Sequence, residues 1–195
     1  EDKWLGSKSG QGFYKKEGKD ILTLDLDALE YRANKKASFA TLELTKTIEK
    51  PIDRFKVLVT GKDKAGDFYR KNFASMFQYC SNRIPEITDA FYKIDDAMKA
   101  GFGWENGPFE IWDAIGVEKG IELMKVEGYQ PASWVTDMVA SGVTSFYSVK
   151  DGATHFYSIT NKKVEKVPGQ DAFIILNNIR ESKKVWNNSD SIITD

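Results

Sequence analysis

The sequence predicts a mainly α-helical fold with two small β-hairpins. Apolar side chains recur at steps of three and four residues between 68 and 94, which is typical of a helix with one buried face. Further short helical segments end at glycines, and helices of about three turns with glycine stops indicate a compact bundle. Segments rich in aromatic and β-branched residues, around 13–32 and 146–167, predict the hairpins.

Composition excludes several classes of protein. The 195 residues are 41% hydrophobic and 29% charged, which argues against a disordered chain and is enough for a hydrophobic core. A net charge of −1 argues against a nucleic-acid binder, and a single Cys and a single His argue against a disulfide framework or a multi-His metal centre. The longest apolar run, 172–176, is too short for a membrane span, and residues 1–4 do not resemble a signal peptide. We therefore expect a reducing, cytoplasmic setting.

The first elements are a loop and a hairpin. Residues 4–14 contain three glycines within seven positions, which favours a loop over a helix. We expect an extended stretch over 13–24, a turn, and a returning strand over 29–32. The polar residues 33–38 then form a connector to the helical region.

Proline and glycine set the limits of the central helices. A helical pattern over 42–48 ends before Pro51, which suits the first turn of the next helix, and Gly61 closes that helix. The long periodic segment 68–94 contains Pro85. We therefore expect a kink or a break just before this proline.

The later elements follow the same rules. Asp95 can cap a further turn that ends near Gly101, and Pro108 begins a helix that Gly116 ends. The remaining elements are expected as helices over 117–127 and 131–141, strands over 146–149, 154–159 and 163–167, a last helix over 173–184, and a polar linker over 187–190.

An internal repeat links the two hairpins. Residues 12–18 read GFYKKEG and residues 145–152 read SFYSVKDG, so that an aromatic pair leads to a glycine turn in both. The repeat predicts the end of one unit followed by a nearly complete second unit. Because the chain opens without Met and stops on a β-prone run, we expect a piece excised from a longer polypeptide.

Several motifs resemble the C-terminal domain of 3-hydroxyacyl-CoA dehydrogenases. Residues 5–14 (LGSKSGQGFY) are similar to the terminal signature of that domain. Residues 82–87 (NRIPEI), 94–99 (IDDAMK) and 101–116 (GFGWENGPFEIWDAIG) resemble its second copy, which occurs in multifunctional dehydrogenase/enoyl-CoA hydratase proteins of fatty-acid β-oxidation. The resemblance covers about residues 4–150.

The resemblance implies a four-part organisation. Residues 1–32 would end a first dehydrogenase repeat with its hairpin, 33–67 would form a helical connector, and 68–150 would form the second helical repeat. Residues 151–195 would lead through a hairpin, a helix and a linker toward a hydratase domain.

The resemblance also implies an activity for the parent protein, the NAD-dependent oxidation of 3-hydroxyacyl-CoA to 3-ketoacyl-CoA. No strand followed by GxGxxG occurs in this chain. NAD and the catalytic His and Glu would therefore belong to an upstream Rossmann domain, and the chain alone would hold no cofactor and be inactive. It would shape the acyl-CoA cleft, support dimerisation and connect two active domains. The alternative is a non-catalytic helical module that binds a protein partner.

Four residues are candidates for the substrate cleft or an interface. In the family's first copy an Asn in a motif comparable to that of Asn82 lies near the substrate carbonyl, although a structural role is the alternative. Glu110 and Asp113 share a helical face, which suits an acid/base or metal pair, or favourable charge at a helix start with an interdomain hydrogen bond. Trp112 either packs between helices or lines an acyl pocket. Lys8 could contact a phosphate of CoA or NAD, although its loop lacks the GxxxxGK[ST] order. We assign no catalytic, cofactor-binding or metal-binding residue to the chain.

Overall fold

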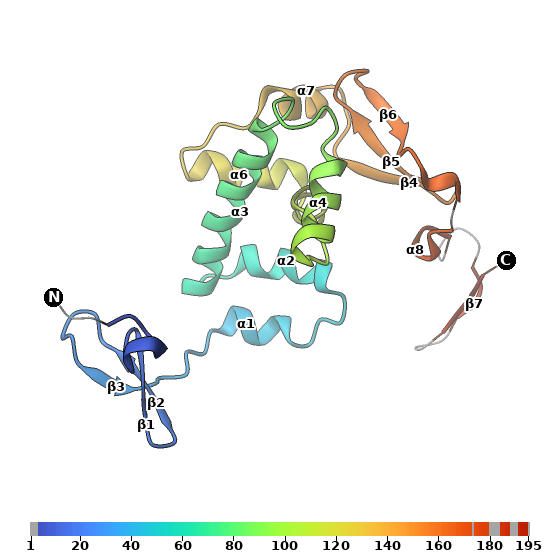
Figure 1. The fold of residues 1–195 in the computed structure, drawn as a ribbon. Coiled ribbons are helices and arrows are strands. Elements are labelled where there is room, and N and C mark those ends of the chain that lie inside the picture. The colour runs from blue at the N-terminus through green and yellow to red at the C-terminus, as the bar shows by residue number, and fades with distance from the viewer. Residues whose placement is uncertain (1–3, 173, 180–183, 188–190, 195) are drawn as a thin grey trace. The chain divides into compact units, whose positions relative to one another are not determined.

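The computed structural model describes residues 4–172, 174–179, 184–187 and 191–194. The chain divides into two compact units, Glu1–Ser38 and Phe39–Asp195, and each is described by itself (Figure 1). The four-part division expected from the sequence therefore stays a prediction.

The first unit is a three-stranded antiparallel sheet preceded by a short 3-10 turn. Its elements are η1 (Ser7–Ser9), β1 (Tyr14–Glu17), β2 (Asp20–Leu24) and β3 (Tyr31–Ala33), with strand order β1-β2-β3. The glycine turn that the repeat predicts is confirmed at Gly18, which adopts a φ of +59° and divides the extended stretch 13–24 into β1 and β2. A left-handed φ costs glycine little, so this position becomes a hairpin turn. The expected hairpin is thus a three-stranded sheet.

The second unit is mainly helical. Its first seven helices are α1 (Ala40–Thr45), α2 (Pro51–Thr60), α3 (Lys64–Asn82), α4 (Tyr92–Phe102), α5 (Pro108–Ile115), α6 (Val117–Val126) and α7 (Ser133–Ala140). The proline starts at Pro51 and Pro108 are confirmed, and so is the end of α5 at Gly116. Helix α3 packs against α2, α5 and α6, and α5 also contacts α2, α4 and α6.

The segment 68–94 is broken rather than continuous. The break expected just before Pro85 is confirmed, because α3 ends at Asn82 and a stretch of turns separates it from α4, which begins at Tyr92. The break changes the phase of the apolar pattern. As a consequence Ile87, which the periodicity assigns to the buried face, is 66% exposed.

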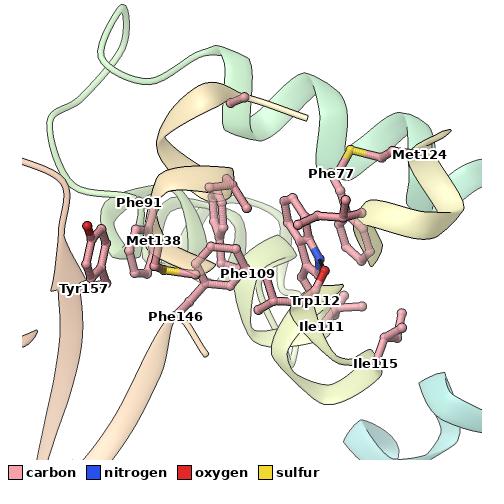
Figure 2. Packing of buried hydrophobic residues seen from close by; sticks show 14 of the residues in the cluster. Phe77, Phe91, Phe109, Ile111, Trp112, Ile115, Met124, Met138, Phe146 and Tyr157 are labelled. Atoms are coloured by element: carbon pink, nitrogen blue, oxygen red, sulfur yellow. Dashed lines mark hydrogen bonds between the residues drawn. The ribbon is translucent and has the colours of Figure 1, made fainter. Parts of the chain in front are cut away.

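Aromatic side chains form the centre of the helical core. Phe77 stacks on Trp112 with ring centroids 4.6 Å apart, and Phe109 lies between the rings of Trp112 and Phe91. Phe146, which enters from the segment after α7, packs edge-on against Phe109 at 5.1 Å (Figure 2). Since buried aromatic rings contribute large apolar areas and favour offset or edge-to-face contacts, this cluster fixes the helices to one another.

A second antiparallel sheet follows the helices. It comprises β4 (Tyr147–Lys150), β5 (Ala153–Ser158) and β6 (Lys163–Lys166) in the order β4-β5-β6, which confirms the three strands expected over 146–149, 154–159 and 163–167. The last elements are η2 (Gln170–Ala172), α8 (Leu176–Ile179), β7 (Lys184–Asn187) and β8 (Ile192–Thr194), and β7 pairs with β8.

The prediction of a last helix over 173–184 is wrong in extent. Only Leu176–Ile179 is helical, and Lys184 begins a strand, while 173 and 180–183 lie outside the described residues. The expected polar linker 187–190 starts with the end of that strand, and its other positions also lie outside them.

Candidate functional site

Helix α5 begins at a glycine and receives its cap from another helix. Gly107 has no side chain to accept from the first N–H groups of the helix, which must find partners elsewhere. The Asp95 carboxylate, in the first turn of α4, accepts from the N–H of Phe109 at 2.9 Å and from that of Glu110 at 3.1 Å. A Cβ at position 107 would overlap the Asp95 side chain, so glycine makes room for this carboxylate. The expectation that Asp95 caps its own helix is therefore wrong.

The second carboxylate, that of Asp113, holds the sheet to the helices. Its two oxygens accept from the N–H groups of Phe146 at 2.7 Å and Tyr147 at 2.8 Å. The Tyr147 hydroxyl then donates to Asp95 at 2.8 Å. Two carboxylates and one phenol thus join α4, α5 and the start of β4 in one network.

Burial dominates the electrostatics of this network. Loss of hydration raises the pKa of both Asp95 and Asp113 to about 7, although the backbone N–H donors act in the opposite direction. The pKa of Tyr147 is raised by burial and by the neighbouring charge of Asp95, which keeps its hydroxyl a proton donor. Every oxygen of Asp95, which is buried, and of Asp113, which is half-buried, accepts a hydrogen bond, so their arrangement suits a structural role.

The polar network borders a cavity of about 500 Å³. Glu110 reaches its wall, where one carboxylate oxygen accepts from the Gly107 N–H at 2.8 Å and the other pairs with the Lys99 ammonium at 2.7 Å. Burial acts to lower the pKa of Lys99, but its hydrogen bond to Glu110 and the nearby negative charges raise it overall, so Lys99 remains a cation. The lining residues are Tyr92, Asp96, Lys99, Glu110, Tyr147, Thr154, Val167, Pro168, Gln170, Ile175 and Asn178. Convergent polar groups around a concave space make this the candidate site for a small polar ligand.

The four candidate residues from the sequence do not come together. Glu110 lines the cavity, whereas Trp112 is fully buried and donates to the Val117 carbonyl at 3.0 Å, which agrees with a packing role. Asn82 is exposed at the end of α3 and donates to the Gln78 carbonyl. Lys8 is exposed in η1 of the first unit. A substrate role for any of them stays a prediction.

Sequence reasoning missed the two residues that complete the network. Asp95 was assigned to its own helix, because a cap from a distant helix leaves no periodic signal. Tyr147 carried a signal, since it belongs to the repeated Phe-Tyr pair, but its bond to Asp95 spans 52 residues. For Glu110 and Asp113 the sequence offered two explanations, and their contacts agree with the structural one. Glu110 accepts from the Gly107 N–H at the start of α5, and Asp113 accepts a hydrogen bond from Phe146 across elements.

Two other cavities offer less for ligand binding or catalysis. One, between α1 and α2, contains Asp63, whose pKa is lowered to about 2 by hydrogen bonds from Thr41 and Gly66. Those bonds cap α3 and join it to α1, so the charge already has its partners. The other is an apolar groove between α3 and α4 that includes Cys80, whose pKa burial raises to about 11. A thiol with so high a pKa is a poor nucleophile at neutral pH.

The glycine run of the first unit does not fit a dinucleotide. A dinucleotide fingerprint needs a parallel strand leading through glycines into a helix N-terminus. Here Gly6, Gly10 and Gly12 surround a three-residue 3-10 turn and lead into an antiparallel strand. In the parts of the chain that the structure describes, no three His, Cys, Asp or Glu side chains gather as metal ligands. Among those same residues, no helix combines the length and apolar character that crossing a bilayer requires.

Comparison with known proteins gives consistent similarities. Residues 68–150 match the family model described as 3-hydroxyacyl-CoA dehydrogenase, C-terminal domain. Over 154 residues the chain is 40% identical to a probable 3-hydroxyacyl-CoA dehydrogenase of Bacillus subtilis, covering 79% of this chain and 19% of that protein. Over 115 residues it is 28% identical to a putative fatty acid oxidation complex trifunctional enzyme of Rickettsia felis, covering 57% and 14% respectively. The chain thus spans about a fifth or less of the length of these relatives. No solved structure matches it significantly.

Proposed function

We propose that the chain is the helical region of a 3-hydroxyacyl-CoA dehydrogenase, because residues 68–150 match the model of that family's C-terminal domain. On this proposal it forms one wall of the acyl-CoA cleft and carries no catalytic residue of its own. The family match is the observation that carries the proposal. Asp95 and Asp113 agree with it, because their oxygens are all engaged in holding helices and sheet together.

We place NAD on another domain. Two features of the described residues support this placement, because their sheets are antiparallel and the glycine run does not lead from a parallel strand into a helix. The names of the Rickettsia relatives, which are trifunctional enzymes, support a neighbouring hydratase domain in the longer polypeptide. The single cysteine and these bacterial relatives support a cytoplasmic setting.

Activity measurements on two proteins test the proposal. The chain alone is expected not to oxidise NADH in the presence of acetoacetyl-CoA. A chimera of the Bacillus subtilis relative, in which this chain replaces the matched segment, should oxidise NADH within about tenfold of the parent rate, because cleft contacts affect turnover without supplying the chemistry. Turnover by the isolated chain, or a folded chimera without activity, would refute the proposal.

Self-association is part of the same proposal. Large apolar side chains are exposed along α3 and α4, among them Phe68, Tyr79 and Phe102, with exposures of 59%, 61% and 75%. Burying such side chains against a second copy would remove apolar area from water, which favours association. We expect dimers by light scattering at high concentration, and a monomer there would contradict this part.

A further inference from the structure

A groove on the helical unit is lined mostly by aromatic and apolar side chains. Its volume is about 330 Å³, which is within the size range of small-molecule sites. The walls come from α2, α3, α5 and the connection between α4 and α5. Four aromatic residues and one acidic residue are part of the lining: Phe55, Tyr69, Phe73, Trp104 and Glu105. None of these five lines the polar cavity beside Lys99.

The rings of the groove are arranged differently in its two walls. Phe55 meets Phe73 edge-on, with ring centroids 5.6 Å apart, and Tyr69 packs against Phe73 at 5.7 Å. Trp104 is 39% exposed and contacts no other aromatic ring in the part of the chain that the structure describes. The face of an aromatic ring is electron-rich, and among aromatic side chains Trp attracts cations most strongly. Part of the Trp104 indole is therefore open to a ligand that carries positive charge.

The connection between α4 and α5 holds Trp104 in a defined position. Gly103 ends α4 with a φ of +67°, a conformation that suits glycine at the end of a helix. The Trp104 N–H donates to the Met98 carbonyl at 3.4 Å, and the Gly107 N–H donates to the Glu110 carboxylate at 2.8 Å. Because both ends of this short connection are bonded, a ligand would not have to order it, which favours binding.

The charge of the groove is negative. Glu105 is the only residue with a formal charge among the described residues that line it, and it makes no ion pair with any residue that the structure describes. The cation–π contacts of the described residues involve Tyr31 and Tyr79, so no Lys or Arg among them lies over the rings of this groove. Arg54, on α2, instead donates to the Ile48 carbonyl at 2.8 Å. The aromatic faces and one unpaired carboxylate therefore suit a cation from outside the chain.

We propose that this groove binds a small organic cation, an alkylammonium ion. Its apolar substituents would pack against Phe55, Tyr69 and Phe73, and its positive charge would lie against the Trp104 ring and near Glu105. Aromatic walls are the usual way in which proteins recognise quaternary ammonium groups. Hard metal cations need several oxygen ligands, which a groove with a single carboxylate does not offer. CoA and NAD carry phosphate groups that Glu105 would repel, so this site is separate from the ligands of the dehydrogenase reaction.

Two ligands of the same shape test the role of charge. Choline and dimethylbutanol, the alcohol in which carbon replaces the choline nitrogen, are titrated separately into the full chain. Binding is followed by nuclear magnetic resonance of the indole N–H groups of the five tryptophans. The Trp104 signal should move most, and choline should bind at least ~5-fold more tightly than the alcohol. Phosphocholine, which presents the same ammonium group as a lipid head group does, should bind more weakly than choline because its phosphate lies near Glu105.

Two substitutions test the residues that would receive the charge. Trp104→Leu keeps an apolar wall and should weaken choline binding roughly fivefold or more, with a smaller effect on the alcohol. Glu105→Gln should weaken choline binding about 2- to 5-fold and reduce its dependence on salt. Glu118→Gln is the matched control, because Glu118 is exposed on α6 and does not line the groove, and it should leave binding unchanged.

Several outcomes would overturn the inference. They are equal affinities for choline and the alcohol, an unmoved Trp104 signal, tighter binding of phosphocholine than of choline, and equal choline affinities for Glu105→Gln and Glu118→Gln. If Trp104→Leu does not fold, Glu105→Gln carries the comparison, because Glu105 is exposed. These measurements report binding without NADH, so their failure would leave the proposed dehydrogenase function untouched.

Discussion

Replacing Asp113 by asparagine exchanges one of its two carboxylate oxygens for an NH₂ group and changes the side-chain volume very little. The aspartate uses both oxygens, at 2.7 Å and 2.8 Å, to accept from the N–H groups of Phe146 and Tyr147. Asparagine keeps one acceptor but turns an NH₂ group toward the other N–H, so two donors face each other in a buried site. The substitution therefore attacks the attachment of the second sheet to α5 without disturbing the core packing.

The expected cost follows from the bonds that are lost. A hydrogen bond to a charged group contributes roughly 1.5–3 kcal/mol, and leaving a buried donor unsatisfied costs about 1–3 kcal/mol. Removing a buried charge offsets part of this, since burial already raises the pKa of Asp113 to about 7. We expect Asp113→Asn to lower the free energy of unfolding by about 2–3 kcal/mol at pH 8. In a unit of this size that corresponds to a fall in Tm of roughly 5–10 °C.

Urea unfolding followed by circular dichroism gives the change in free energy, and hydrogen exchange locates it. The Phe146 and Tyr147 amides should exchange faster in Asp113→Asn even under conditions in which the helices remain folded. Asp137→Asn is the matched control, because Asp137 is exposed on α7, and it should change stability by less than about 0.5 kcal/mol. Equal stabilities for the two variants, or unchanged exchange at Phe146 and Tyr147, would refute the reasoning.

Further predictions concern pH and two glycines. Because the folded pKa of Asp95 and Asp113 is about 7 and their ordinary value is 3.8, the folded chain holds more protons between these values. Stability should therefore fall as pH rises from about 4 to 7, on the order of 1 kcal/mol per pH unit for each group, and Asp95→Asn should remove about half of the slope in urea titrations. Asp63 acts in the opposite direction: its folded pKa is about 2, so the stability it contributes is lost as the pH falls below about 4. Melting temperatures should therefore be highest near pH 4. A continuous rise toward neutral pH would contradict the lowered pKa of Asp63 and the raised pKa of Asp95. Gly120→Ala places a methyl group against the buried ring of Trp112 and should lower the free energy of unfolding by about 1–3 kcal/mol. Gly101→Ala, at a helical position open to solvent, should raise it by about 0.5–1 kcal/mol. Equal melting temperatures for the two variants would refute the packing argument.

Local chemistry made much of the fold predictable. Pro51 and Pro108 start helices because proline lacks the N–H that a first turn leaves unbonded, and Gly116 ends a helix because it tolerates a φ of +105°. The repeated Phe-Tyr pair predicted two similar β segments, and all three strands of the second were found from the sequence. These signals lie within a few residues of the feature they specify, so periodicity and residue type suffice to find them.

The sequence by itself determined the helical class, most helix ends, the family resemblance and the repeat. Tertiary structure alone decided that Asp95 caps α5 across 14 and 15 residues, and that Asp113 holds a sheet across 33 and 34. It also decided that Glu110 faces a cavity while Trp112, two residues later, is fully buried. The physical reason is that a buried carboxylate needs donors, and which N–H groups reach it depends on how helices pack rather than on their neighbours in the chain.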